Sequence, residues 1–451
     1  MTTQGDPTTT TGAQKPTSLG VIFLTVFIDL MGFSLIFPLF PAILDHYIAV
    51  DGTDGLLGGL LDVLRRATEA GDRDPDVYVA VLFGGVLGSL YAFLSFVFAP
   101  LWGRLSDRIG RRRVLIVTVF GTALSYVVWF FAQSFWVLVL SRLLGGVMSG
   151  NISVANAAIA DVTTIENRAK GMGMLGAAFG LGFILGPAIG GALAQVDLTT
   201  TVSLWGVNPF SSAALGALAL SAVNLVWVVR RFHETLSPEN IGRAHAPRPL
   251  NPIKAMIHVD VPHVNPTNLV YFIYTLAFTG MEFTLTFLAR DRFAYTPGKN
   301  ALLFVYVGFL IALVQGGVVR RLAPKLGEKK LALMGFALVI PGLVVTGLAS
   351  SELLLYAGLG LLSIGSALAT PSLTALVSLY APAHRQGEIL GVFRSLGSLA
   401  RAIGPLVAAT IYWKFGSAWP YLSAALVMVI PTLMVFPLPT PSARTDRVVG
   451  H

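Results

Sequence analysis

Long apolar stretches alternate with short polar loops along nearly the whole chain. About 20 residues of α-helix span the roughly 30 Å of hydrocarbon in a bilayer, and twelve stretches reach or approach that length. They lie at residues 19–44, 77–102, 114–132, 136–160, 170–195, 208–230, 267–289, 301–319, 331–349, 352–380, 387–412 and 418–438. This pattern predicts an all-α polytopic membrane protein with twelve transmembrane helices. The first stretch is longer than the apolar core of a signal peptide, about 7–15 residues, so we expect it to remain as a span.

The second half of the chain repeats the first at a nearly constant offset in the numbering. The basic stretch Arg104–Arg113 corresponds to Arg321–Lys330, and the pairs Gly186-Pro187 and Gly404-Pro405 follow Arg168 and Arg385 at almost the same spacing. Two copies of a six-span unit predict two pseudo-symmetric six-helix bundles, with a substrate site between them near the membrane midplane. The expected parts are a tail at 1–18, a bundle at 19–231 with an outside loop at 45–76, a linker at 232–265, a bundle at 266–438 and a tail at 439–451.

Charge and composition agree with a membrane location. Only 12% of the 451 residues are charged, against about 25% in soluble proteins. The 31 Lys and Arg residues divide into 21 in one set of loops, 7 in the other and 3 inside spans. Cytoplasmic loops carry the excess of positive charge, so we expect a multi-pass protein of the cell (inner) membrane with both termini cytoplasmic. The net charge of +8 lies in short loops between spans, and we predict no nucleic-acid partner.

The outside loop at 45–76 contains leucines with helical spacing and charged residues on the other face (Leu56, Leu57, Leu60, Leu61 and Leu64 against Asp62, Arg65, Arg66 and Glu69). A short amphipathic helix on the membrane surface explains this pattern. A solvated helix packed on the ends of the spans explains it equally well.

Five ionisable residues lie deep inside apolar stretches: Asp29, Arg142, Glu282, Arg394 and Arg401. A charge at the bilayer midplane costs at least about 2.5–3.5 kcal/mol on insertion scales. Each of these side chains therefore needs a partner or an aqueous cavity, which makes the five candidates for a functional site.

Polar residues accompany these charges with helical spacing. The sets are Arg142, Ser149, Ser153 and Asn156 in the fourth span, Thr275, Thr279, Glu282 and Thr286 in the seventh, and Arg394, Ser398 and Arg401 in the eleventh. Residues with this spacing share one helical face, and such faces are expected to line a central cavity. The alternative for each Ser or Thr is a hydrogen bond to its own or a neighbouring helix. The alternative for Arg394 is to reach the cytoplasmic interface.

The charges suggest an anionic substrate and protons as the coupling ion. Three arginines exceed two carboxylates, and a cavity with surplus positive charge attracts anions. The hypothesis is an amphipathic organic anion or drug bound by Arg142, Arg401, Arg394, Ser398, Asn156 and Thr279. Burial and a nearby arginine act in opposite directions on a carboxyl group, so Glu282 is the expected proton carrier and Asp29, paired with Arg142, its helper. A fixed structural ion pair is the alternative for either carboxylate.

Several motifs resemble the major facilitator superfamily. The hinge containing Gly103, Asp107 and Gly110 followed by Arg111-Arg112-Arg113 is similar to its loop 2–3 signature, and Arg142 before Gly145-Gly146 to its fourth-span motif. The fifth-span run Gly182, Gly186-Pro187 and Gly190-Gly191 resembles a motif associated with drug–proton antiporters. The first span, with Asp29–Gly32, Pro38 and Pro41, resembles tetracycline-exporter carriers. The runs Gly280–Leu285 and Arg394–Arg401 are most similar to the animal tetracycline-transporter-like proteins, regarded as organic-anion effluxers.

The resemblance implies a gate at the basic hinge. Asp107 is expected against the start of the eleventh helix near Gly387, where the helix dipole favours a carboxylate. Arg111–Arg113 are expected to pair with Asp161 or Glu166, or to act only as positive anchors. The gating residues are Gly103, Asp107, Arg108, Arg111, Arg112, Gly186 and Pro187. Because Pro324 takes the place of Asp107 in the second half, a carboxylate gate is expected in one half only.

The predicted function is a proton-coupled antiporter, a monomer, that exports organic anions or drugs by alternating access. The first alternative is a symporter or facilitator of a small polar solute. Such a protein is expected to contain more Asn, Gln and Trp in its spans than this chain does. The second is a non-transporting receptor or scaffold, which would want a larger ordered loop or terminal domain. We expect no enzyme, metal or cofactor: no cysteine is present, the seven histidines lie in loops without ligand spacing, and no Walker, HExxH or nucleophile-elbow motif occurs.

Overall fold

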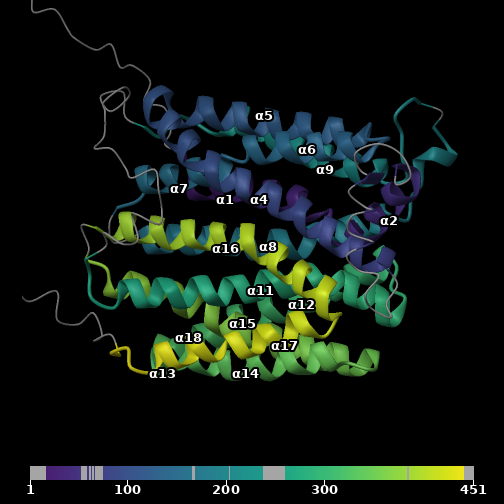
Figure 1. Cartoon of the computed structure of the whole chain (residues 1–451). Helices are drawn as coiled ribbons and strands as arrows, with labels where there is room; N and C mark the ends of the chain where they lie inside the picture. The colour runs from purple at the N-terminus through teal and green to yellow at the C-terminus, as the bar shows by residue number, and fades with distance from the viewer. Residues whose placement is uncertain are drawn as a thin grey trace, which may run out of the picture.

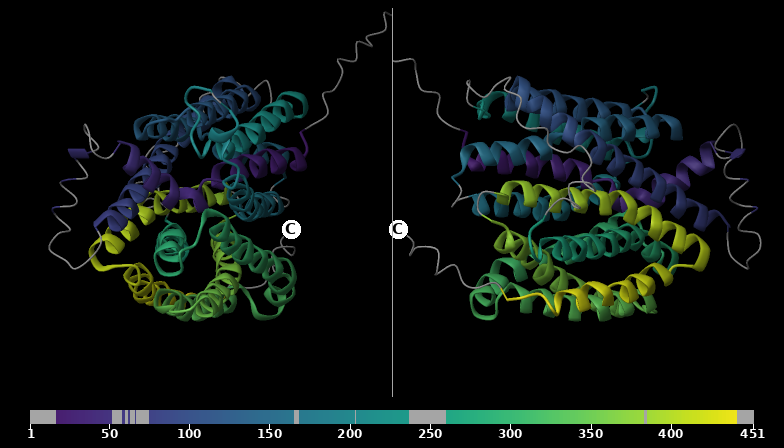
Figure 2. Two further views of the ribbon diagram at one scale, coloured as in Figure 1. Left: turned by 90° about the vertical axis from the view of Figure 1, so that its right-hand side faces the viewer. Right: turned by 60° about the vertical axis from the view of Figure 1, so that its left-hand side comes forward.

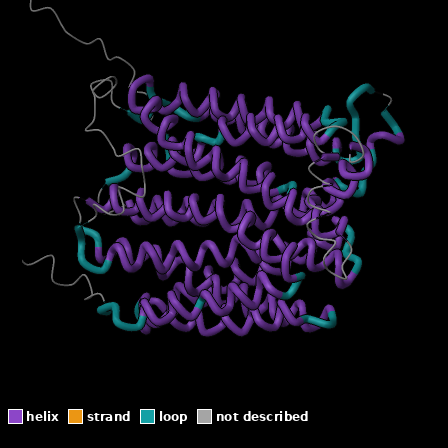
Figure 3. The backbone as a smooth tube through the Cα atoms, viewed as in Figure 1, coloured by secondary structure: helices purple, strands orange, loops and turns teal. Residues whose placement is uncertain are grey.

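The computed structural model describes residues 17–51, 58–59, 62, 66, 75–164, 168–202, 204–236, 260–382 and 385–440. Within these ranges the chain is helical and contains no strand (Figure 3). Most of the predicted amphipathic helix at 56–64 and most of the predicted linker lie outside the described residues. The long helices run side by side in one bundle (Figure 1).

The first half holds α1 (Leu19–Ser34), η1 (Phe37–Leu39), α2 (Phe40–Asp51), α4 (Pro75–Ile109), α5 (Arg111–Phe130), α6 (Phe135–Met148), α7 (Asn151–Val162), α8 (Arg168–Leu193), η2 (Leu198–Thr200) and α9 (Ser211–Arg231). The second half holds α11 (Val264–Phe293), α12 (Pro297–Leu313), the π-helix η4 (Val314–Val319), α13 (Arg320–Leu326), α14 (Glu328–Leu348), α15 (Glu352–Tyr380), α16 (Gln386–Phe415), α17 (Trp419–Val427) and α18 (Val429–Val435).

The predicted twelve spans are confirmed in the part of the chain that the structure describes. Ten helical segments are long and apolar enough to cross a membrane. The eleventh is α16, 30 residues long, which contains Arg394 and Arg401 and is therefore less apolar. The twelfth is the apolar stretch Trp419–Val435, made of α17 and α18.

The backbone repeats at the offset that the sequence predicted. Gly110, before α5, has φ 100° and ψ 151°, and Gly327, before α14, has φ 77° and ψ 157°. The next helices, α6 from Phe135 and α15 from Glu352, keep the offset between these two glycines. Glycine populates positive φ without the steric penalty that a Cβ brings, so both halves use the same residue for the same turn. The two halves form two groups of helices when the bundle is viewed along its length (Figure 2, left).

Three spans are interrupted. The first bends at Leu35 and Ile36 before Pro38 and Pro41, and the eighth ends in the π-helix η4. The fourth breaks at Ser149 and Gly150, between α6 and α7. The prediction that Arg142 and Asn156 share one continuous helical face is therefore wrong. Gly150 leaves no room for a side chain beside the Trp102 ring, and Trp102 Nε1 donates to the Val147 carbonyl at 2.6 Å.

Among the described residues, helices of the two halves come into close contact toward one end of the bundle. We call the end with the hinges Arg104–Arg113 and Arg321–Lys330 the basic end, and the other the opposite end. Toward the opposite end, Gly85 of α4 faces Ala409 of α16 and Gly191 of α8 faces Ala301 of α12, without room for a side chain.

Toward the basic end, the α8 face that meets α12 loses its partner. Gly176, Gly180, Ile184 and Gly191 have the spacing of one helical face. Ile184 packs on Gly308 of α12, yet a Cβ at Gly180 or Gly176 would meet nothing within 4 Å. The halves are thus closed at the opposite end and separated between α8 and α12 toward the basic end.

Candidate functional site

A cavity lies between the two halves, and the space free of protein atoms in and in front of it, open solvent included, is about 1180 Å³. The first half contributes residues of α1, η1, α2, α4, α6, α7 and α8 to its wall, and the second half residues of α11 and α16. Four charged residues line it: Asp29, Arg142, Glu282 and Arg401. The described chain therefore has its candidate site where the repeat predicted one.

The cavity gathers most of the residues singled out from the sequence. Thr279, Ser398 and Ser149 line it together with the four charges, whereas Asn156 and Arg394 are not among the lining residues. Two arginines face two carboxylates, so the wall is neutral when both acids are ionised. The predicted surplus of positive charge is thus wrong for the wall itself, and arises only when a carboxylate takes a proton.

Asp29 is held by an amide and not by an arginine. Asn151, the first residue of α7, donates from Nδ2 to Asp29 Oδ1 at 2.7 Å. Arg142 instead donates to Ser141 Oγ at 3.3 Å and lies 4.8 Å from the centroid of the Trp129 ring. The predicted Asp29–Arg142 ion pair is absent from the described contacts, because the break in the fourth span brings Asn151 to the carboxylate.

Glu282 and Arg401 face the cavity from α11 and α16 without an ion pair between them. Arg401 donates to Ser398 Oγ at 3.1 Å, and its guanidinium lies 6.0 Å from the centroid of the Phe179 ring. Among the described side chains, no hydrogen bond or ion pair is recorded for Glu282. Both charges are therefore available to a ligand. Thr279 donates to the Thr275 carbonyl of its own helix at 2.9 Å, which agrees with the alternative given for the hydroxyls.

Aromatic rings form the part of the cavity wall toward the opposite end. Phe33 stacks on Tyr91 at 4.7 Å and meets Phe183 edge-on at 6.0 Å, and Phe40 contacts Phe283 of the other half at 5.7 Å. The only signal in the sequence is the helical spacing of Phe33, Phe37 and Phe40. A surface of this kind accommodates the apolar or aromatic body of a ligand.

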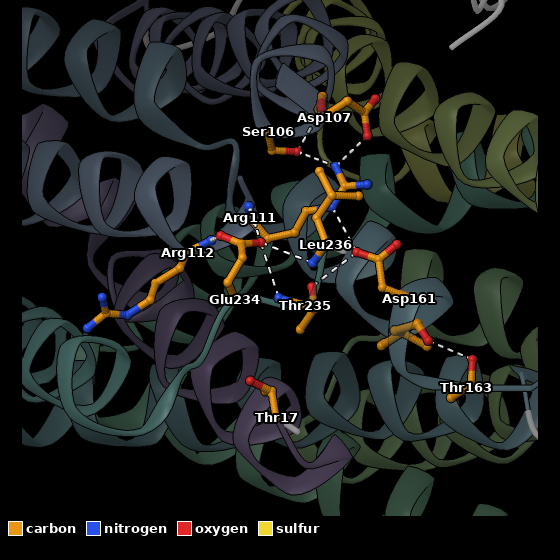
Figure 4. A network of polar contacts seen from close by, with 12 residues as sticks. Thr17, Ser106, Asp107, Arg111, Arg112, Asp161, Thr163, Glu234, Thr235 and Leu236 are labelled. Atoms are coloured by element: carbon orange, nitrogen blue, oxygen red, sulfur yellow. Dashed lines mark hydrogen bonds and ion pairs between the residues drawn. The ribbon is translucent and has the colours of Figure 1, made fainter. Parts of the chain in front are cut away.

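The basic hinge is tied together by a network of polar contacts (Figure 4). Arg111 is only 4% exposed and pairs with Asp107 at 2.5 Å and with Asp161 at 3.0 Å. The predicted pairing with Asp161 is confirmed, whereas Glu166 lies outside the described residues. Arg108 is exposed. The expected position of Asp107 against the start of α16 near Gly387 stays a prediction.

Glu234 belongs to this network and was not found from the sequence. Its carboxylate accepts from the backbone N–H of Arg111 at 2.8 Å and of Arg112 at 3.1 Å, which caps the N-terminus of α5. A side chain at Gly110 would collide with this carboxylate. Arg112 donates to the carbonyls of Phe232 and Val229. The cap and the helix are 123 residues apart, so no local pattern announces the contact.

The glycine run of the fifth span packs mainly within its own half. Gly186 and Gly190 lie against Ser34 and Leu35, at the bend of the first span, and Ser34 Oγ donates to the Gly182 carbonyl at 2.9 Å. Only Gly191 reaches the other half. The interpretation that Gly186 and Pro187 seal the two halves against each other is corrected in this respect: the close approach fixes α8 on α1.

An ion pair joins the halves at the opposite end. Arg290 of α11 donates from Nη1 to both oxygens of Asp45 in α2 at 2.7 Å, and from Nε to Asp291 at 2.8 Å. Asp291 accepts from the Tyr412 hydroxyl of α16 at 2.5 Å. The sequence placed Arg290 in a loop after the seventh span, but α11 continues to Phe293, which carries Arg290 into the contact between the halves.

Comparisons with known proteins agree with this geometry. The family model described as Major Facilitator Superfamily matches residues 22–349 and 318–450. The chain is 34% identical to the human "Major facilitator superfamily domain-containing protein 10", over 94% of this chain and 93% of the relative. It is 29% identical to the Escherichia coli "Tetracycline resistance protein, class B", over 95% and 98%. A crystal structure titled as the human organic anion transporter MFSD10 (TETRAN) superimposes with TM-score 0.73 and 31% identity, covering 92% of this chain and 98% of that one.

Proposed function

Because the chain belongs to the major facilitator superfamily, whose matched relatives are transporters and not enzymes, we propose that it is a secondary active transporter of amphipathic organic anions that couples their movement to protons. One observation carries the proposal. Arg401 and Glu282 face the same cavity between the halves, neither is bound to the other, and aromatic rings cover the adjacent wall.

The substrate class follows from the shape and charge of the cavity. The planar guanidinium of Arg401 suits a carboxylate, which it binds through two parallel hydrogen bonds. Phe179, which lies beside this guanidinium, and the rings of Phe33, Phe183 and Phe283 provide an apolar surface for the rest of the molecule. The crystal structure that matches at 31% identity is titled an organic anion transporter, which supports the same substrate class for this chain.

Glu282 is the proposed proton site, with Asp29 as a second. A carboxylate that lines a cavity without an ion pair gains or loses a proton without breaking a structural contact. Asp29 holds a hydrogen bond to Asn151 of its own half. The two acids therefore have separate roles in the proposal. Glu282 changes its protonation when a ligand binds to Arg401, and Asp29 changes the net charge of the first half by gaining or losing a proton.

The sign of the coupling depends on which group the substrate contacts. An anion on Arg401 weakens the attraction between this arginine and Glu282, and Glu282 then holds a proton more readily. By linkage, such an anion and a proton bind together, which gives cotransport. Antiport, expected from the sequence, requires that substrate and proton exclude each other.

Antiport is the second candidate function, and one observation favours it. The Glu282 carboxylate has no recorded partner among the described residues, so a substrate with both an anionic group and a hydrogen-bond donor can occupy Arg401 and Glu282 at once. That ligand displaces the proton. The relatives named for tetracycline resistance agree with export of such a molecule.

We also propose that the basic end faces the cytoplasm, since 21 of the 31 Lys and Arg residues lie in loops of that side. The cavity would then face inward, with both termini cytoplasmic, in the cell membrane. Alternating access requires that the Asp45–Arg290 contact opens as the basic end closes. The predicted division into bundles at 19–231 and 266–438, and the monomeric state, belong to the same proposal.

The test is the change in proton binding when substrate is added. The purified protein in weakly buffered detergent solution receives a fluorescent organic anion, and a pH indicator follows the solution. Cotransport predicts proton uptake, antiport predicts proton release, and Glu282→Gln abolishes either signal. The matched control is Glu352→Gln, which changes an exposed residue that pairs with Lys299 at the opposite end. This variant should keep the proton signal. Anion binding without any proton exchange in the wild type would contradict proton coupling.

A further inference from the structure

Asn151 is a buried polar residue beside the cavity to which the proposed transport cycle assigns no role. It begins α7 directly after the break at Ser149 and Gly150, and it is 1% exposed. Its Nδ2 donates to Asp29 Oδ1 at 2.7 Å. Its Oδ1 is buried and has no hydrogen-bond partner in the described structure. A buried amide oxygen without a donor is uncommon, and here it belongs to the same amide group that holds the carboxylate.

We infer that Asn151 is a positioning residue for a proton on Asp29, an inference that rests on the proposed proton coupling. When Asp29 is ionised, Asn151 Nδ2 donates to one carboxylate oxygen. When Asp29 is protonated, its O–H donates to Asn151 Oδ1, while Nδ2 continues to donate to the other oxygen. A carboxylic acid and a primary amide form two such hydrogen bonds side by side. The amide therefore serves both protonation states, and the orphaned oxygen is the acceptor that the acid requires.

Other ionisable groups around Asp29 do not replace the amide. The ionisable groups that interact with it from neighbouring helices are Tyr91 of α4 and Tyr126 of α5, and Arg142 of α6 lines the same cavity. Helices α7, α8 and α9 pack on α1, but their charged residues lie in the last turn of α7, the first turn of α8 and the last turn of α9, at the basic end. Among the described contacts, no ion pair reaches Asp29, so Asn151 is its recorded hydrogen-bond partner.

The break in the fourth span is what places Asn151. In an uninterrupted helix, residue 151 would follow Arg142 by nine steps of about 100° each, which would place the two residues on opposite sides of that helix. Instead the chain bends at Gly150, whose lack of a side chain accommodates Trp102. The Trp102 indole donates to the Val147 carbonyl, one of the acceptors near the helix end that the break leaves free. The break beside Trp102 thus places the Asn151 amide against Asp29.

The experiment reads the protonation of Asp29 directly. Infrared difference spectra of the purified protein, titrated between pH 4 and pH 10, report the C=O stretch of protonated carboxyl groups. The Asp29 band is identified as the one that Asp29→Asn removes. We expect Asn151→Leu to change both the frequency of this band and its titration midpoint, by about one pH unit or more, since the group loses its hydrogen-bonding partner. Asn151→Asp, which keeps the volume, should add a second titrating carboxyl coupled to the first.

Asn224 of α9 provides a matched control. It is fully buried, its Nδ2 donates to the Thr25 carbonyl of α1 at 3.0 Å, and its Oδ1 also has no partner. Asn224→Leu removes a similar contact to α1, at Thr25, which lies one helical turn from Asp29. It should lower thermal stability as Asn151→Leu does, yet leave the Asp29 band unmoved.

Equal behaviour of the Asn151 and Asn224 variants would overturn the inference, as would the absence of a band that Asp29→Asn removes. Because the spectra need no transport, they distinguish this failure from a failure of the proposed function. If the proposed function is wrong, the Asp29 band still responds to Asn151 while flux ignores the pH gradient. If the inference about Asn151 is wrong, flux responds to the pH gradient and the Asp29 band does not depend on Asn151.

Discussion

The two walls of the cavity treat their charges differently. In the first half, Asp29 is held by Asn151 and Arg142 lies on the Trp129 ring, 4% exposed. In the second half, Arg401 has a single hydroxyl contact, to Ser398, and Glu282 has no recorded partner in the described structure. The first wall places its charges against an amide and an aromatic ring of its own half, although Arg142 Nε has no hydrogen-bond partner in the described structure, whereas the second wall leaves its charges for a ligand. The two halves thus contribute different kinds of wall to one cavity, a more structural side from the first half and a binding side from the second.

The largest expected effect is that of Arg401→Ala on anion transport. Losing a hydrogen bond to a charged group costs about 1.5–3 kcal/mol, so we expect apparent affinity for organic anions to fall about 10- to 100-fold with little change in thermal stability. Flux of a fluorescent anion into proteoliposomes measures it. The exposed Arg231 of α9 gives the control substitution Arg231→Ala. Unchanged anion flux in Arg401→Ala would remove the binding role from the second wall.

Arg142→Ala should have the converse effect. The guanidinium over Trp129 contributes up to about 2 kcal/mol when desolvated, and its removal is expected to lower the unfolding temperature more than Arg401→Ala does. Thermal unfolding of both variants, followed by intrinsic tryptophan fluorescence, makes the comparison. If Arg142→Ala were the more stable and the more impaired in anion binding, the roles of the two walls would be reversed.

A smaller effect is expected where the halves touch at the opposite end. Asp45→Asn weakens the contact with Arg290, and a change of about 1 kcal/mol alters a population about fivefold. Since the chain contains no cysteine, a single cysteine at Leu44, which is 1% exposed beside this contact, reports opening by its rate of alkylation. We expect roughly a fivefold faster rate in Asp45→Asn. Glu352→Gln in the same background should leave the rate unchanged, and an equal acceleration there would show a non-specific effect.

The smallest effect concerns the helix cap at the basic end. Glu234→Ala removes the acceptor for two backbone N–H groups of α5, and loss of a cap costs about 1 kcal/mol. A modest fall in thermal stability is expected, without a change in anion affinity. Glu234→Gln, which retains an acceptor oxygen, should recover part of the stability. A loss of anion affinity in Glu234→Ala would show that the hinge communicates with the cavity.

The sequence predicts the spans and the cavity charges because both are conspicuous in an apolar chain. Twelve apolar stretches and a repeat at constant offset were enough for the fold, and Asp29, Glu282 and Arg401 stand out among residues that carry no charge. Their environments were harder to predict. Asn151 meets Asp29 across 122 residues, and Arg290 meets Asp45 across 245. Contacts of this kind depend on where a helix breaks or how far it extends, which propensity alone does not determine.

The fourth span illustrates the limit. Ser149 and Gly150 sit inside an apolar stretch that is compatible with a continuous helix, and a single glycine is tolerated in a helix at a cost of about 1 kcal/mol. At the break, Trp102 of a neighbouring helix fills the space beside Gly150 and donates to the Val147 carbonyl, a contact that the local sequence does not announce. The break removes Arg142 and Asn156 from a common helical face and brings the amide of Asn151 to Asp29. The predicted Asp29–Arg142 ion pair is therefore absent, although the sequence identified both residues.

The most direct test of the account is flux in proteoliposomes with an imposed pH gradient, for the wild type, Glu282→Gln and the control Glu352→Gln. The account predicts that organic-anion flux follows the gradient in the wild type and in Glu352→Gln. It predicts that flux in Glu282→Gln is independent of the gradient while the anion still binds through Arg401. Flux that ignores pH in the wild type, or that keeps its full pH dependence in Glu282→Gln, would contradict the assignment of Glu282 as the proton site.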